Sequence, residues 1–151
     1  MNGWECLFIG ELGASVALSG LVFVGISINL TKLLASSHLP NRALEALVAL
    51  IAVLFTSYLI LIPGQPFLDM GIEVLFIGLI DWAVVLFLQL SSLRKMPPQY
   101  RREFARVIPV CQMAALCFVV AGIVLIITGT NGLYWLVAAM LLSFLAAFTD
   151  A

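Results

Sequence analysis

Five long apolar stretches constrain this sequence more than any other feature. They cover residues 8–30, 43–62, 70–90, 107–127 and 132–148 of the 151-residue chain. A bilayer core about 30 Å thick takes roughly 20 apolar residues as a helix. Only helices and closed barrels satisfy all their backbone polar groups in lipid. The sequence therefore predicts an all-α, polytopic integral membrane bundle, with one domain and five transmembrane helices.

The composition agrees with a chain that lies in a lipid bilayer. Hydrophobic residues make up 64% of the sequence and charged residues only 10%, whereas soluble domains average about 25% charged residues. The net charge of −1 gives no basic surface, so we do not expect nucleic acid as a partner. The three cysteines form no CxxC pair, and we interpret them as ordinary thiols.

The basic residues predict how the helices are oriented. Lys32 and Arg42 fall in the first connection, and the other five fall in the third: Arg94, Lys95, Arg101, Arg102 and Arg106. Because cytoplasmic loops carry the excess of Lys and Arg, we expect the amino terminus outside and the carboxyl end inside. The third connection then serves as a topology anchor or, alternatively, as a contact for anionic lipids or a partner.

The first stretch has two distinct faces when drawn at 100° per residue. Gly13, Ala17 and Gly20 form a seam of small residues, a pattern that lets another helix approach closely. Glu11, Ser15 and Asn29 fall on a different face, more than 90° away. We expect this polar face either to bond within the bundle or to line a pathway.

The same stretch carries a resemblance to a known group of proteins. The segment "GASVALSGLVFVGISINLTKLL" (residues 13–34) and the "LIPGQ" after the second stretch (residues 61–65) resemble a family of small polytopic bacterial membrane proteins. The family is mostly actinobacterial, and some members carry the label modulator of FtsH protease. The resemblance implies about five helices in the bacterial cytoplasmic membrane. It implies no catalytic residues.

The third stretch contains a polar stripe. Asp81 lies in the middle of an otherwise apolar run, with Glu73 eight residues before it and Gln89 eight residues after it. Each interval corresponds to about 12 Å along a helix, so the stripe runs from the outer interface to the inner boundary. An aspartate at that depth costs about 2.5–3.5 kcal/mol unless it meets water, a partner or a proton. Gln112, in the fourth stretch, is expected to meet Asp81 or, from its depth, Gln89.

Two functions remain open from these patterns. The first is a homo-oligomeric cation or proton pathway through Glu73, Asp81 and Gln89, to which Glu11, Asn29 and Ser15 contribute from the first helix. The second is a non-conducting adaptor or modulator that binds a partner membrane protein through the small seam. In the second, Asp81 is structural and bonds to polar groups on neighbouring helices.

Three further expectations follow from single residues. The only histidine, His38, lies in a loop, and the membrane stretches hold one central aspartate, so we expect neither an enzyme nor a metal or cofactor site. Gly78 and Gly122 are expected at close helix contacts. Pro109 is expected in the first turn of the fourth helix, where proline is tolerated.

Overall fold

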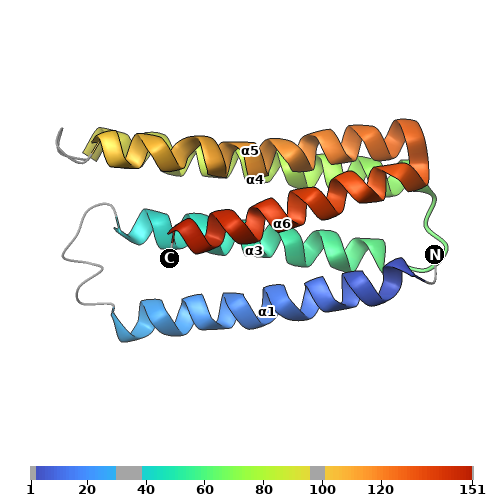
Figure 1. Cartoon of the computed structure of the whole chain (residues 1–151), viewed down its shortest axis with the longest axis horizontal. Coiled ribbons are helices and arrows are strands. Elements are labelled where there is room, and N and C mark those ends of the chain that lie inside the picture. The colour runs from blue at the N-terminus through green and yellow to red at the C-terminus, as the bar shows by residue number, and fades with distance from the viewer. Residues whose placement is uncertain (1–2, 30–38, 96–100, 151) are drawn as a thin grey trace.

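The computed structural model describes residues 3–29, 39–95 and 101–150, and almost all of these residues are helical (Figure 1). No β-strand occurs within those ranges. The elements are α1 (Trp4–Ile28), α3 (Leu39–Ile60), α4 (Phe67–Lys95), α5 (Arg101–Thr128), the short 3-10 helix η1 (Gly129–Asn131) and α6 (Gly132–Asp150). The predicted all-α class is therefore confirmed.

Each predicted apolar stretch coincides with a helix, but the helices have different ends. α4 extends the stretch 70–90 by several residues in both directions, and α5 begins six residues before the stretch 107–127. Helices need not end where apolar residues end, because charged residues also have good helix propensity. Pro109 consequently lies inside α5 and not in its first turn. The expectation for Pro109 was wrong, and its ring removes one backbone hydrogen bond from the helix interior.

Four helical stretches of the described chain are long and apolar enough to cross a membrane. They are Trp4–Ile28, Ala43–Ile60, Phe67–Arg94 and Cys111–Ala147. The fourth runs through α5, η1 and α6, and the chain reverses its direction at η1 (Figure 1). A connection as short as residues 128–131 predicts an antiparallel hairpin, and α5 and α6 pack against each other accordingly.

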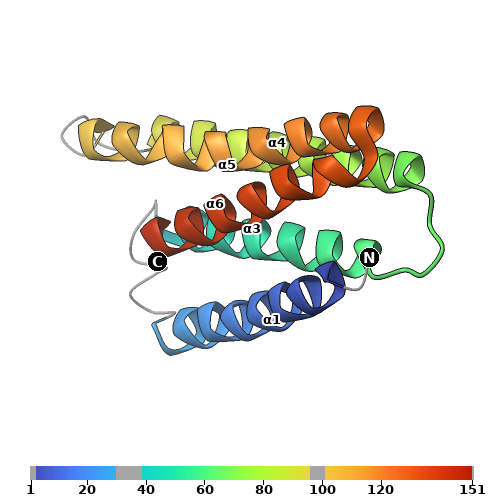
Figure 2. The same ribbon diagram turned by 45° about the vertical axis from the view of Figure 1, so that its right-hand side comes forward.

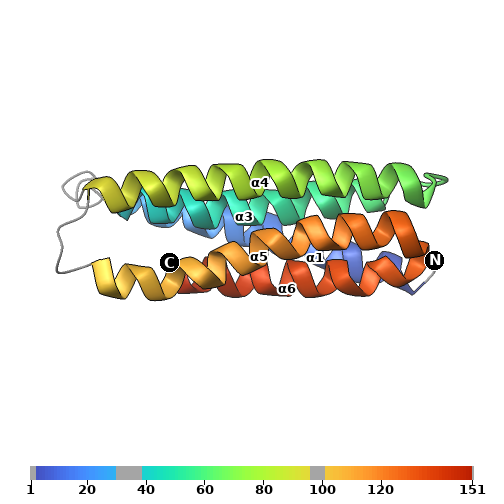
Figure 3. The same cartoon turned by 90° about the horizontal axis from the view of Figure 1, so that it is seen from above.

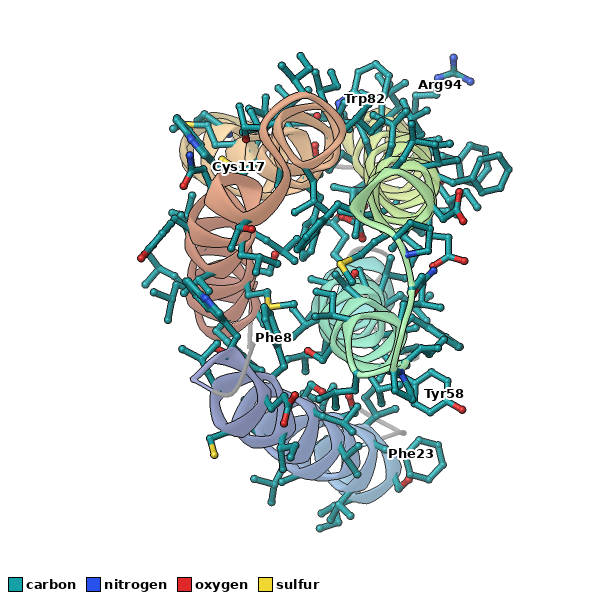
Figure 4. All side chains as sticks on the ribbon, turned by 90° about the vertical axis from the view of Figure 1, so that its right-hand side faces the viewer. Phe8, Phe23, Tyr58, Trp82, Arg94 and Cys117 are labelled. Carbon is teal, nitrogen blue, oxygen red and sulfur yellow. The ribbon has the colours of Figure 1, made fainter. Side chains whose placement is uncertain are left out.

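The helices lie nearly parallel or antiparallel to one another along the long axis of the molecule (Figure 3). α3, α4, α5 and α6 form a closed ring in which each helix contacts the next, and α6 returns to α3. α1 lies outside this ring and packs mainly against α3 (Figure 2). Viewed along the axis, the four helices surround a common core and α1 is placed to one side (Figure 4).

Two turns depend on the conformational freedom of glycine. Gly64 has a φ of +80° in the turn between α3 and α4, and Gly129 has a φ of +62° where α5 ends. Residues with a Cβ rarely adopt these angles. Pro63 precedes the first of these glycines and stops α3 from continuing, so this turn brings α4 back alongside α3.

α4 and α5 approach each other through their glycines. A Cβ added at Gly122 would come within 2.7 Å of the Leu75 backbone nitrogen, and one added at Gly78 within 2.9 Å of that of Val119. Both distances are shorter than real side chains allow, so only glycine permits this backbone separation. The predicted close contacts at Gly78 and Gly122 are confirmed.

Candidate functional site

The polar residues of α4 turn toward the helix core. Asp81 is 4% exposed, Gln89 is 2% exposed and Ser92 is fully buried. They share this face with the apolar core residues Val74 and Val85, because steps of three and four residues return to one side of a helix. Asp81, Gln89 and Ser92 therefore face the core that α4 shares with α3, α5 and α6 of its own subunit.

A chain of side-chain hydrogen bonds joins three helices near Gln89. The indole Nε1 of Trp82 donates to Oε1 of Gln112 at 2.8 Å, and Nε2 of Gln112 donates to Oε1 of Gln89 at 2.7 Å. Nε2 of Gln89 then donates to Oε2 of Glu45 on α3 over a longer 3.4 Å. Gln112 meets Gln89, as its depth predicted. An amide can link such a chain because it carries both donors and an acceptor.

Asp81 borders a small cavity inside the ring. Glu45 on α3, Ser143 on α6 and Cys111 on α5 also line it. The remaining wall consists of Val85 and four alanines: Ala49, Ala114, Ala115 and Ala146. The cavity leaves about 10 Å³ for the centre of a water-sized sphere, which is about the minimum for one water.

Asp81 lacks the full set of hydrogen bonds that a purely structural role predicts. Its Oδ1 atom is buried and has no hydrogen-bond partner. Gln112, one of the partners expected for it, bonds to Gln89 and Trp82 instead. A buried carboxylate oxygen without a partner is costly, so Asp81 leaves an unmet hydrogen-bonding need at the edge of this cavity.

The polar residues of α1 do not reach this cluster. Ser15 is buried, but its Oγ donates to the carbonyl of Leu12, and the exposed Asn29 donates from Nδ2 to the carbonyl of Gly25. Glu11 is half-buried on the same outlying helix. Ser15, Asn29 and Glu11 are absent from the cavity wall, so the structure does not bring them to Asp81 within the subunit. Ser and Thr in apolar helices readily bond to their own backbone in this way.

Glu73 occupies a separate position near the turn between α3 and α4. It is half-buried, and its Oε2 accepts a hydrogen bond of 2.6 Å from Nε2 of Gln65. Gln65 belongs to the "LIPGQ" segment, so this contact fixes the turn against the first part of α4. The structure therefore assigns Glu73 to the end of the bundle and not to the cavity.

The small seam of α1 faces away from the rest of the subunit. Gly13, Ala17 and Gly20 are exposed, and a Cβ added at either glycine would meet nothing within 4 Å. The two buried residues of α1 are Phe8 and Ser15, on a different face of the helix. Within the subunit, then, α1 does not use the seam predicted for packing.

The predicted lipid or partner contacts lie at the opposite end of α4 from Glu73. Arg94 is exposed, and a shallow hollow on α4 is bordered by Arg94, Phe87, Leu90 and Ser91. Lys95 ends α4, and Arg101, Arg102 and Arg106 belong to the beginning of α5. The side chains of these four residues lie outside the described part of the structure.

Sequence reasoning missed Glu45, Trp82 and Ser143. α3 begins at Leu39, so Glu45 lies in its second turn, where the carboxylate faces the core. The spacing of Glu45, Ala49, Ala52 and Thr56 along one face of α3 could have indicated this. Ser143 had no such signal, because its neighbours on α6 are uniformly apolar.

The polar side chains of this region carry carboxyl, amide and hydroxyl groups. Among the residues that the structure describes, no three His, Cys, Asp or Glu side chains come together to hold a metal ion.

Compared with known proteins, the chain matches no family model, no curated protein and no solved structure. Its function must therefore be argued from the arrangement of its own residues.

Proposed function

We propose that the chain is an integral protein of a bacterial cytoplasmic membrane with five crossings, the amino end outside and the carboxyl end in the cytoplasm. The hairpin of α5 and α6 supports the fifth crossing, because each helix has at least 19 residues and a bilayer core needs about 20. The basic residues support the orientation, because the helix ends beside both basic connections lie at one end of the bundle: the end of α1, the start of α3, the end of α4 and the start of α5 (Figure 1).

Within that membrane, we propose that the protein is a non-conducting adaptor or modulator that binds a transmembrane helix of a partner through α1. The observation that carries this proposal is the exposed seam of Gly13, Ala17 and Gly20, which has open space above both glycines. Small residues favour helix association because they let two backbones come close. In α4 and α5 such glycines are already covered, whereas the seam of α1 is not.

The position of Asp81 favours the adaptor over a pathway. A pathway shared between subunits needs its acid on a water-filled surface or on an oligomer axis. Asp81 is instead enclosed by α3, α5 and α6 of its own subunit, at a cavity of about one water. The resemblance of residues 13–34 to a family partly labelled as protease modulators points to the same class of function.

Site-specific photo-crosslinking in native membranes tests the adaptor. A photoreactive side chain at Ala17 should give one adduct of defined mass, and one at the exposed Phe87 of α4 should not. An adduct of twice the subunit mass would identify a second copy as the partner and establish a homo-oligomer. Equal labelling from both positions, or none from Ala17, would contradict the proposal.

A cation or proton pathway is a second candidate, and the polar face of α4 favours it. Asp81, Gln89 and Ser92 lie on one buried face, and the hydrogen bonds from Gln89 continue to Glu45. Flux into proteoliposomes, followed with proton- and cation-sensitive dyes, tests this candidate directly. A wild-type flux that Asp81→Asn abolishes would establish conduction and displace the adaptor, whereas absence of flux at both membrane polarities would remove the candidate.

We propose that the basic connection at the cytoplasmic end binds anionic lipids. Arg94 is exposed beside Phe87 and Leu90, so its charge can reach the headgroups while the apolar side chains face lipid tails. Lys95, Arg101, Arg102 and Arg106 would add to this attraction, at about 1 kcal/mol for each charge near an anionic surface.

A further inference from the structure

Small side chains from several helices form the cavity beside Asp81. Ala49, Ala114 and Ala146 come from three different helices, and together with Ser143 they leave a space that larger residues would fill. Interiors are normally packed without such spaces. A cavity of this size that also borders a carboxylate is suited to a small polar occupant.

The groups that border this space are mainly acceptors. Oδ1 of Asp81 has no hydrogen-bond partner, and the residue is only 4% exposed. The hydroxyl of Ser143 donates its proton to the carbonyl of Ala139 at 3.0 Å, so its lone pairs remain for another ligand. Glu45, which also borders the cavity, already accepts from Gln89 through Oε2. An occupant must therefore supply positive charge or protons.

We propose that this cavity binds one sodium ion. Asp81 supplies the charge and Ser143 a neutral oxygen, with Glu45 on the neighbouring helix α3. Oxygen ligands of this kind are those that hard cations prefer. The absence of a third acid or a histidine among the described neighbours argues against a divalent ion. A cation here would link α3, α4 and α6 at one point.

This site does not depend on the proposed adaptor function, nor on conduction. A cation held in a closed cavity can stabilise the bundle without crossing it. Loss of crosslinking from Ala17 would therefore leave the site untouched, and loss of the site would leave the seam of α1 in place. The two proposals fail separately.

Thermal unfolding of the purified full chain in mild detergent tests the site. The melting temperature is measured as sodium chloride replaces choline chloride at constant ionic strength and pH. A ligand that binds only the folded state should raise the melting temperature by roughly 5–10 °C at 100 times its dissociation constant. Asp81→Asn should abolish the rise, Ser143→Ala should reduce it, and the exposed-acid control Asp69→Asn should retain it.

A second series at constant sodium varies pH and tests whether a proton on Asp81, and not a sodium ion, satisfies the carboxylate. Protonation of Asp81 alone would raise the melting temperature as pH falls without any response to sodium, and Asp81→Asn would remove this dependence while Asp69→Asn keeps it. The titratable groups that also border the cavity are Glu45 from α3 and Cys111 from α5, while α6 contributes the non-titrating Ser143. Glu45→Gln and Cys111→Ala therefore serve as further controls.

The outcomes divide cleanly. A saturable response to sodium that requires Asp81 supports the proposal. The proposal is overturned if the wild-type melting temperature does not respond to sodium, if it responds to pH alone, or if Asp81→Asn responds to sodium as the wild type does.

Discussion

Glycine has opposite surroundings in α1 and in the pair formed by α4 and α5. Gly122 lies against the backbone of Leu75, so closely that no side chain fits, whereas Gly20 has nothing within 4 Å of its would-be Cβ. Both were expected at helix contacts from sequence spacing alone. The difference shows that a small residue permits a close helix contact, but its presence in the sequence does not show whether that contact is made within the subunit. It also divides the molecule into a closed ring and an outlying helix with a free face.

The largest expected effect comes from adding one methyl group at the two kinds of glycine. Gly122→Ala should lower the free energy of unfolding by about 3 kcal/mol, because the added carbon overlaps backbone atoms that cannot rotate away. Gly20→Ala should leave it unchanged or raise it by up to about 1 kcal/mol through helix propensity. Unfolding in mixed detergent, followed by circular dichroism, measures both. Equal effects would show that α1 does not differ from the pair of α4 and α5 as described.

The next largest effect tests whether the buried hydrogen bonds of Gln89 contribute more to stability than the hydrogen bond between Gln65 and Glu73 at the turn. Gln89→Leu removes the partners of Gln112 and Glu45 inside the ring, and should cost about 1–3 kcal/mol. Gln65→Leu breaks the contact with Glu73 near the end of the bundle, where water can replace it, and should cost about 0.5 kcal/mol. The same unfolding assay ranks the two variants, and the reverse order would contradict the assignment.

A smaller effect concerns how α1 is held. The rings of Trp4 on α1 and Tyr134 on α6 meet edge to face with centroids 4.8 Å apart. Such pairs contribute about 0.5–1.5 kcal/mol beyond burial, so Trp4→Leu should lower the unfolding free energy by about 1 kcal/mol. Trp135→Leu, at a side chain that is 52% exposed, serves as the control and should change it by less than about 0.5 kcal/mol.

The smallest effect on stability is expected at the free face of α1. Ala17→Leu adds bulk to an exposed position and should change the unfolding free energy by less than about 0.5 kcal/mol. It should nevertheless abolish crosslinking from a photoreactive group at Gly20, because a leucine keeps the partner backbone away. A variant that unfolds more readily would instead place the seam inside the subunit.

Much of the fold could be predicted because the apolar stretches are long and their connections short. Each of the five long helices in the described ranges coincides with one of the stretches, and the short connection 128–131 predicts the hairpin of α5 and α6. The ends of the helices were less accessible to prediction, since charged residues such as Arg101 continue a helix beyond the apolar part. Pro109 was misplaced for the same reason.

The candidate site could be predicted only in part, for a geometric reason. Helical spacing shows which residues share a face, and it correctly grouped Asp81 with Gln89. Spacing does not show which neighbouring helix a face meets, so it could not show that Ser15 lies away from Asp81 or that Glu45 lies beside it. Ser143 lines the cavity because α6 packs against α3 and α5, which no local pattern records.

The three-residue turn η1 also determines how part of the chain acquires its topology. α6 contains no Lys or Arg, so it has no charge signal of its own. A turn of three residues is far too short to cross a bilayer, so α6 must return to the side on which α5 began. In the proposed membrane topology, the two helices would enter the membrane together, and α6 would take its orientation from the arginines that precede the apolar part of α5. Reversing those charges would turn over two helices at once.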